Sequence, residues 1–229
     1  MKIKWGALVV AGRGKIGGHV GSRNSAGDYL RTKVTPVNPN TSAQALVRNR
    51  LAVISQAWRG LTEDQRTSFN AAVSDFAKTD IFGDLKNPTG FNLYQRLNNN
   101  LSVVGATAIT VAPRPEAVLT TVIGALAIDV GVGDAMTLAT SGAVPAGTSM
   151  EIWGTPGLSP GKSFVKSEYR LLAVVAALGT SPFNLQSVIT AKFGVPAVGS
   201  KVFAQIKFVN TTTGQASTTQ STSTIVVST

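Results

Sequence analysis

The most regular hydrophobic pattern in the chain lies within residues 36–76. Val47, Leu51, Ile54 and Trp58 recur at spacings of four, three and four residues, so they fall on one face of an α-helix. A helix with one apolar face normally buries that face against the rest of the fold. The pattern therefore predicts an amphipathic helix that is packed along this face.

Capping signals mark the limits of this helix and the start of a second one. Thr41 is followed three residues later by Gln44, and Thr62 is followed by Gln65; each pair has the form of a capping box. Gly60 lies between the two pairs and is expected to end the first helix. Helices joined by so short a connection fold back on each other, so the stretch predicts a helical hairpin.

The second helix has an apolar face of its own. Phe69, Val73 and Phe76 form this face, and Trp58 and Leu61 stand near the corner between the helices. We expect the apolar residues of both helices to be buried together, with the aromatic rings contributing most of the contact area.

A third helix is predicted after a loop. Residues 80–88 contain Gly83 and an Asn-Pro pair, which favour a loop. Thr89 then has the position of an N-cap. The apolar stripe that follows consists of Leu93, Leu97 and Leu101, with Phe91 and Tyr94 beside it. The asparagines at 98–100 and Gly105 are expected to weaken the end of this helix.

The composition changes after Pro113-Arg114-Pro115, where we place a domain boundary. Beyond it Val, Thr, Ala and Gly dominate and the helical period disappears. The predicted strands are 125–130, 135–140, 148–153, 167–175, 185–191, 200–209 and 221–227. About seven short strands separated by turn residues are typical of an immunoglobulin-like or fibronectin-like β-sandwich.

Residues 1–35 are rich in glycine and basic side chains. Short extended segments are expected at 8–11, 16–22 and 29–34. So small a set of strands cannot support itself, and we expect it to lie on the helical hairpin or on another molecule. The Gly-x-Gly-x-x-Gly pattern at 12–17 is not followed by a helix or by a suitably spaced acid, so it does not indicate a dinucleotide site.

These features predict an α+β multidomain protein. Its parts are an extended basic N-terminal arm with short strands (1–35), a small helical hairpin or bundle (36–110) and an immunoglobulin-like β-sandwich (116–229).

The charge is concentrated in the first part of the chain. The whole chain has 21 Lys and Arg against 11 Asp and Glu, and residues 1–50 hold nine of these bases against a single acid, Asp28. Such clustering points to a negatively charged partner. The candidate partner-binding residues are Lys2, Lys4, Arg13, Lys15, Arg23, Arg31, Lys33, Arg48 and Arg50.

The composition argues against several classes of chemistry. The chain has no cysteine and one histidine, which excludes disulfides, cysteine nucleophiles and Cys/His zinc sites. Asp129 and Asp134 flank a Gly-Val-Gly turn without the ligand-rich loop of a calcium site. We expect no enzymatic activity, no cofactor, no metal and no small-molecule substrate.

No membrane association is expected. The N-terminus lacks the apolar core of a signal peptide. The longest wholly apolar run, 171–178, is far shorter than a membrane span. We therefore expect a soluble protein with no membrane partner.

Binding to nucleic acid is an open alternative. The basic segment could neutralise phosphates in a salt-dependent manner. The segment has no recognisable base-reading helix, and Trp5 and Tyr29 are too few for a stacking platform. Contact with the phosphate backbone alone is compatible with the sequence.

Several motifs resemble those of a family of phage and prophage proteins from gut Bacteroidota. They are Gly14-Lys15-Ile16-Gly17, Val20-Gly21-Ser22-Arg23-Asn24, Asp28-Tyr29-Leu30-Arg31, Pro36-Val37-Asn38-Pro39-Asn40-Thr41, Gln44, Val47-Arg48, Trp58, Leu61-Thr62 and Gln65-Arg66. The similarity is specific over about residues 12–70. The family has the same order of basic glycine-rich N-terminus, helical hairpin and immunoglobulin-like domain.

This resemblance implies a virion structural protein of a crAss-like or related phage, located in the capsid after synthesis in the host cytoplasm. It implies an auxiliary protein, of the cement or decoration type, that binds the major capsid protein or other virion proteins through the arm. The alternatives are a head–tail connector, tail or head-fibre-anchoring protein, or a protein whose arm makes non-specific contact with packaged DNA.

Overall fold

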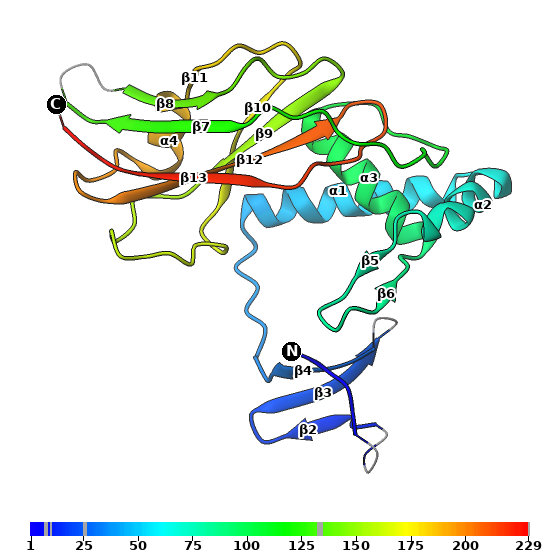
Figure 1. Ribbon diagram of the computed structural model, residues 1–229. Helices are drawn as coiled ribbons and strands as arrows, with labels where there is room; N and C mark the ends of the chain where they lie inside the picture. Colours follow the sequence, from blue (N-terminus) through cyan, green and yellow to red (C-terminus); the bar gives the residue numbers. More distant parts are fainter. Residues whose placement is uncertain (7–8, 10, 25–26, 132–134, 229) are drawn as a thin grey trace.

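The computed structural model describes residues 1–6, 9, 11–24, 27–131 and 135–228. Two β-sheets lie at one end of the molecule and a group of helices lies beside them (Figure 1). The N-terminus belongs to a separate small sheet at the opposite end, whereas the C-terminus lies at the outer end of the two-sheet part (Figure 1). The chain is therefore a mixed α/β structure with several antiparallel sheets.

The helical part follows the predicted order. It contains α1 (Ser42–Arg59), α2 (Glu63–Ala71), the 3₁₀ turn η1 (Ala72–Ser74) and α3 (Gly90–Val104). Thr62 forms the complete capping box with Gln65. Thr41 caps α1 by accepting a hydrogen bond from the Gln44 amide. The capping box predicted at Thr62 is thus confirmed. At Thr41 only the first half of the box is present, because the Gln44 side-chain oxygen has no hydrogen-bond partner among the described residues.

The predicted apolar face of α1 is only half buried. Ile54 is buried and Trp58 is partly buried, but Val47 and Leu51 are 57% and 52% exposed. Their expected burial is wrong because α3 packs against the C-terminal half of α1, where Trp58 contacts the Tyr94 ring. In the part of the chain that the structure describes, no element covers the first half of this face.

Aromatic rings form the core of the helical part. Trp58 lies 6.0 Å from Phe69 and 5.7 Å from Phe91, measured between ring centroids. Phe69 and Tyr94 meet edge to face at 5.2 Å. Such pairs stabilise a fold by about 0.5–1.5 kcal/mol beyond the area that they bury.

α3 also joins the helices to the two-sheet part. Leu101 is buried as predicted, and the Asn100 side chain donates to the Gly214 carbonyl at 2.8 Å. Asn98 is buried, and its side chain forms two hydrogen bonds with the backbone of Ile109: it accepts one from the N–H group and donates one to the carbonyl oxygen. Asn98 and Asn100 thus gain partners outside the helix, which isolated propensity does not include. The helix continues through all three asparagines to Val104, and a weakening of its end by these residues stays a prediction.

The loop predicted at 80–88 contains part of a hairpin. The strands β5 (Lys78–Thr79) and β6 (Leu85–Lys86) pair antiparallel. The turn between them includes Gly83 with a φ of +85°, a conformation that glycine adopts without strain.

The C-terminal part consists of two antiparallel sheets. Their strand orders are β11-β8-β7 and β10-β9-β12-β13. The strands are β7 (Ile123–Asp129), β8 (Ala135–Thr140), β9 (Thr148–Gly154), β10 (Arg170–Val175), β11 (Phe183–Asn184), β12 (Lys201–Asn210) and β13 (Gln220–Ile225). Six of the seven predicted strands match these closely.

The seventh, predicted at 185–191, is wrong, because this segment is the helix α4 (Gln186–Phe193). The Asn184 side chain accepts a hydrogen bond from the Gln186 amide and turns the chain. Leu185 and Ile189, four residues apart, are both buried. This spacing is that of a helix, although the β-branched composition favoured a strand.

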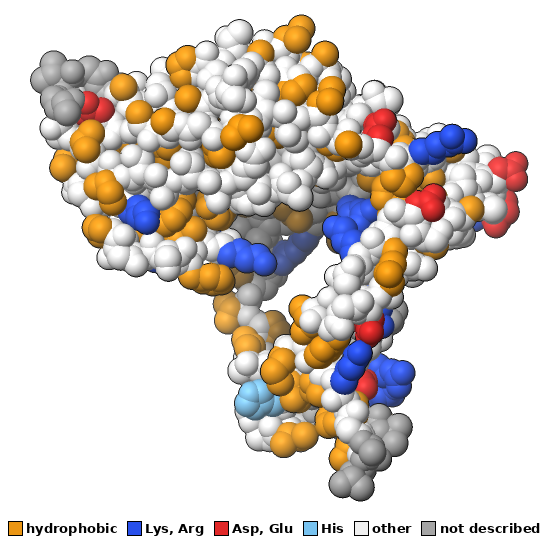
Figure 2. Space-filling view, viewed as in Figure 1, with side chains coloured by type: hydrophobic (Ala, Val, Ile, Leu, Met, Phe, Trp, Pro, Cys, Tyr) orange, Lys and Arg blue, Asp and Glu red, His pale blue; other side chains and the backbone are white. Residues whose placement is uncertain are grey.

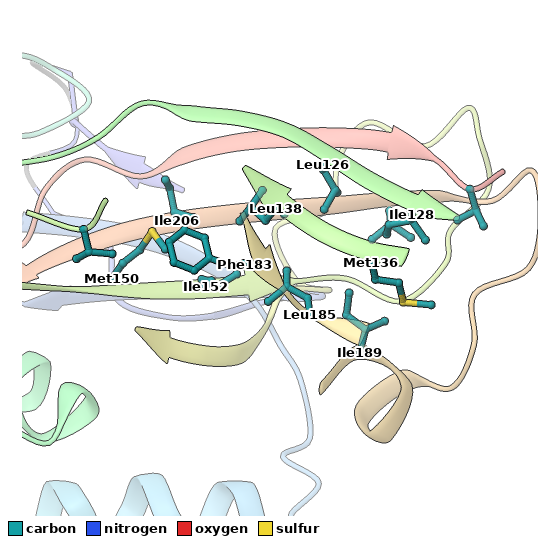
Figure 3. Packing of buried hydrophobic residues seen from close by; sticks show 14 of the residues in the cluster. Leu126, Ile128, Met136, Leu138, Met150, Ile152, Phe183, Leu185, Ile189 and Ile206 are labelled. Carbon is teal, nitrogen blue, oxygen red and sulfur yellow. The ribbon is translucent and has the colours of Figure 1, made fainter. Parts of the chain in front are cut away.

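Both sheets contribute to one hydrophobic core (Figure 3). Leu126, Ile128 and Leu138 come from the three-stranded sheet. Ile152 and Ile206 come from the neighbouring strands β9 and β12 of the four-stranded sheet. The packing of two sheets around shared side chains is compatible with the expected β-sandwich.

The first part of the chain forms a four-stranded antiparallel sheet, here called the N-terminal sheet. Its order is β1-β4-β3-β2, with β1 (Lys2–Ile3), β2 (Gly14–Ile16), β3 (His19–Asn24) and β4 (Gly27–Thr32).

The expected strands of this region are only partly correct. The single strand predicted at 16–22 is interrupted: Ile16 ends β2 and residues 19–22 begin β3, because Gly17 and Gly18 form the turn between them. The segment predicted at 29–34 overlaps β4, and the one at 8–11 includes residues outside the described part. Among the described residues of this sheet only Gly21 is buried, and every residue of 33–41 is exposed.

We expect Gly214→Ala to destabilise the protein by about 2 kcal/mol or more. Gly214 has a φ of +70°, and an added Cβ would lie 2.5 Å from the Leu97 carbonyl oxygen. Gly199→Ala is the matched control, since its φ of +79° is similar but its Cβ would meet nothing within 4 Å. Chemical denaturation of both variants gives the comparison; equal losses would contradict the proposed packing of α3 on the β12–β13 turn.

Candidate protein-docking surface

Two ion pairs attach the N-terminal sheet to the β5–β6 hairpin. The Lys2 ammonium lies 3.3 Å from the Asp80 carboxylate, and the Lys4 ammonium lies 3.0 Å from that of Asp84. Figure 2 shows positive and negative side chains next to each other where the hairpin meets the sheet. Lys4 also lies 5.3 Å above the centre of the Phe82 ring, a cation–π arrangement.

Asp80 is the most enclosed group of this contact. Its side chain is 5% exposed, and its Oδ1 atom accepts hydrogen bonds from the amides of Phe82 and Asp84 at 2.8 and 3.1 Å. Desolvation by burial acts to raise the pKa of Asp80. The bonds from the Phe82 amide, Lys2 and the Asp84 amide outweigh it and hold the pKa below its ordinary value of 3.8.

Glycines allow the N-terminal sheet to be covered closely by its own chain. A Cβ on Gly12 would overlap the Trp5 ring, and one on Gly21 would lie 3.0 Å from the Gly12 carbonyl oxygen. These two positions therefore serve packing of the backbone. This accounts for part of the glycine pattern that resembled a phosphate-binding motif in the sequence.

Three basic residues lie along one side of the N-terminal sheet, which we call the cationic face. Lys15 on β2 and Arg31 on β4 are both aligned with Val20 on β3. Because aligned residues point to the same side, Lys15 and Arg31 lie roughly 10 Å apart, two strand spacings. Lys33, two residues after Arg31, continues the alternation, and its amide bonds to the Gly18 carbonyl.

The members of the cationic face are exposed. Within the described residues, none of them lies in an ion pair with Asp or Glu. Their charges are thus presented to solvent, where an exposed Lys or Arg is fully hydrated. This is the part of the predicted binding set that the structure brings together.

The other predicted cations are distributed differently. Lys2 and Lys4 are engaged by the hairpin. Arg23 lies 3.7 Å from Asp28 on the adjacent strand, and Arg48 donates to the Asn38 side chain at 2.7 Å. Arg13 and Arg50 have no ion pair with a described residue and are not part of the aligned row. Partner binding by all nine residues stays a prediction.

Sequence reasoning missed the acidic side of this contact. Asp80 was placed in a featureless loop, although an aspartate three residues before a glycine is a common turn signal. The spacing of Asp80, Gly83 and Asp84 could have indicated a hairpin turn. Nothing in the sequence indicated that its two carboxylates face Lys2 and Lys4.

Within residues 1–6, 9, 11–24, 27–131 and 135–228, no group of three or more His, Cys, Asp or Glu side chains is arranged to hold a metal ion. Asp134, one of the two carboxylates considered for calcium, lies outside this set. No helix in the described part of the chain is both long and apolar enough to span a bilayer.

We expect acidification to release the N-terminal sheet from the hairpin. Because the folded-state pKa of Asp80 is depressed, the contact is at full strength above the ordinary aspartate pKa and is lost as the pH falls through the folded value. NMR shifts of the Phe82 and Asp84 amides should therefore report a transition below about pH 4. Asp80→Asn should abolish that transition, and an Asp80 midpoint above the ordinary value would contradict the assignment.

Comparison with known proteins yields no match. No protein-family model, no curated protein and no solved structure matches this chain. An assignment of function therefore rests on the chemistry of the chain's own residues.

Proposed function

We propose that this chain is a structural virion protein of the auxiliary capsid type, which binds the capsid lattice through its N-terminal sheet. The observation that supports the proposal is the cationic face of Lys15, Arg31 and Lys33. A surface of this kind fits an acidic protein surface, where arginine can bind carboxylates through two parallel hydrogen bonds.

The N-terminal sheet has too little core to be stable alone. Its described residues include one buried position, Gly21, and a four-stranded sheet normally needs one covered face. Two ion pairs with the hairpin supply only part of that support. The exposed Lys4–Asp84 pair contributes about 0–1 kcal/mol, and the attraction between Lys2 and the buried Asp80 carboxylate is offset by desolvation. A partner that covers the sheet would supply the rest.

The edge of the sheet offers a second mode of binding. β2 is the last strand in the order β1-β4-β3-β2, and Ile16 on it is exposed. An extended segment of the partner could add to this edge through backbone hydrogen bonds. Lys15 would lie next to such a segment, which favours an acidic sequence.

The rest of the chain would then serve as a rigid body carried by the docked sheet. We propose that the two packed C-terminal sheets form an immunoglobulin-like domain, supported by their strand pattern and shared core. The linker of residues 33–41 contains Pro36 and Pro39, which limit its flexibility.

Two alternatives use the same surface. A head–tail connector, tail or head-fibre-anchoring protein would dock on another virion protein by the same chemistry. A non-specific nucleic-acid binder is favoured by the unpaired cations alone, because phosphates are also anionic. A protein partner is favoured because the cationic face is small and is joined to an open sheet edge.

Replacing the three charges of the cationic face tests the proposal. In Lys15→Gln/Arg31→Gln/Lys33→Gln, we expect affinity for capsid shells of the phage that encodes the chain to fall roughly tenfold or more, since three exposed ionic contacts are lost. Co-sedimentation with shells that lack this protein gives the affinity, and the loss should shrink at high salt.

The matched control removes the same charge elsewhere. Arg59→Gln/Arg114→Gln/Lys192→Gln changes three exposed bases outside the N-terminal sheet and should bind as the unmodified protein does. Equal losses in both variants would refute the docking surface. If the protein binds a 20-base-pair DNA duplex in a salt-sensitive manner but does not bind shells, the nucleic-acid alternative is favoured. If imaging of the particle places the chain at one vertex, the connector alternative is favoured.

A further inference from the structure

A buried carboxylate lies on the outer side of the four-stranded sheet. Along β9, Met150 and Ile152 are part of the core between the sheets, so Glu151 and Trp153 point to the opposite side. Glu151 is 0% exposed, although glutamate is rarely buried completely.

Glu151 holds two neighbours in place. Its Oε2 atom lies 3.0 Å from the Lys207 ammonium and accepts a hydrogen bond from the Trp153 indole N–H at 3.0 Å. Its Oε1 atom is buried and has no hydrogen-bond partner among the described residues. A buried ion pair seldom stabilises a fold more than apolar residues of the same size would. The effect of Glu151 therefore lies mainly in the two side chains that it positions, Trp153 and Lys207.

Both neighbours of Glu151 line a groove of about 660 Å³. The groove lies over β9 and β12, between the loop that connects β9 to β10 and the start of β13, where Thr219 and Ser221 line it. Its principal side chains are Trp153, Phe164, Lys166, Tyr169, Gln205 and Lys207.

The covering loop is anchored but presents an aromatic ring. Val165 is buried, whereas the adjacent Phe164 is 77% exposed. Tyr169 is half-buried, and this burial raises the pKa of its hydroxyl. The Phe164 ring is therefore mostly in solvent, and an exposed phenyl group at a groove rim is typical of a binding site.

The surroundings disfavour a peptide or a nucleic acid. The floor of the groove is formed by β9 and β12, the two central strands of the sheet, which are paired on both sides and offer no free edge for strand addition. β13, which lines one side through Ser221, is the last strand of the sheet. Nucleic acid requires a row of cations along its backbone. The groove is lined by two lysines, Lys207 and Lys166. The charge of Lys207 is neutralised by Glu151, and only Lys166 has no ion pair among the described residues.

We propose that this groove binds a saccharide. One face of a pyranose ring is apolar and would stack on the Trp153 indole, which Glu151 holds in a fixed orientation. The sugar hydroxyls would bind the Gln205 amide and the Lys207 ammonium, and Lys166 would favour an acidic substituent on the sugar. A mainly apolar groove with a few fixed polar groups suits a ligand that is apolar on one face and polar at its edge.

NMR of the full chain tests this directly, because it has three tryptophans, Trp5, Trp58 and Trp153. The probes are chitotetraose, maltotetraose, 3′-sialyllactose and a hyaluronan tetrasaccharide. We expect at least one to shift the Trp153 indole N–H signal saturably while the signals of Trp5 and Trp58 stay in place. No saturable shift with any of the four probes would overturn the proposal, as would a shift with a ten-nucleotide DNA strand alone.

Three variants locate the site. Phe164→Ser and Trp153→Phe should each weaken binding of the responding probe by about tenfold, the loss expected for an aromatic contact. Lys166→Gln should weaken binding of the acidic probes only. Leu119→Ser, at another exposed apolar residue, is the control and should bind normally. Unchanged affinity in Phe164→Ser and Trp153→Phe would overturn the assignment of the groove.

Discussion

The burial of α3 is the constraint on which the main body of the structure depends. At one end, Leu93 and Leu97 pack within the aromatic cluster of the helices. At the other end, Leu101 and Asn100 meet the turn between β12 and β13, where Gly214 leaves no room for a side chain. Because a single rigid helix belongs to both contacts, the helical part and the paired sheets are fixed in relation to each other. The boundary predicted at Pro113-Arg114-Pro115 therefore connects parts that are also joined through α3.

Local signals in the sequence predicted local structure well. The caps at Thr41, Thr62 and Thr89 are formed by contacts within three residues, so nothing distant can alter them. The errors occur where a distant contact decides the outcome. Val47 and Leu51 have the correct period, but α3 ends its contact with α1 before reaching them. Residues 185–191 have strand-like composition, but their burial follows a helical period.

The sequence predicts the excess of positive charge on the candidate docking surface, but it does not predict how the basic side chains are arranged there. Counting bases identifies the first 50 residues, but it cannot distinguish cations that are used internally from those that are free. Lys2 and Lys4 are used to hold the sheet to a hairpin that the sequence did not reveal. Lys15 and Arg31 become neighbours only through the register of three strands. Lys2 is therefore engaged by the hairpin, whereas Lys15 stays exposed, and neither outcome can be found by counting charges.

The chain uses charge in two physically different ways. On the N-terminal sheet the cations are hydrated, and an attraction to the proposed acidic partner would act through water and fall as salt is added. At Glu151 the carboxylate is removed from solvent, and its bonds to Lys207 and Trp153 are shielded from dissolved ions. Hydrated cations such as those of the N-terminal sheet can attract many acidic surfaces but do not orient any of them closely. The buried Glu151 attracts little at a distance, but it fixes the Trp153 indole and the Lys207 ammonium in space. Fixed groups of this kind are what recognition of a small ligand requires. Ionic strength should therefore separate the two sites: rising salt would weaken docking through the sheet while leaving the geometry of the groove intact.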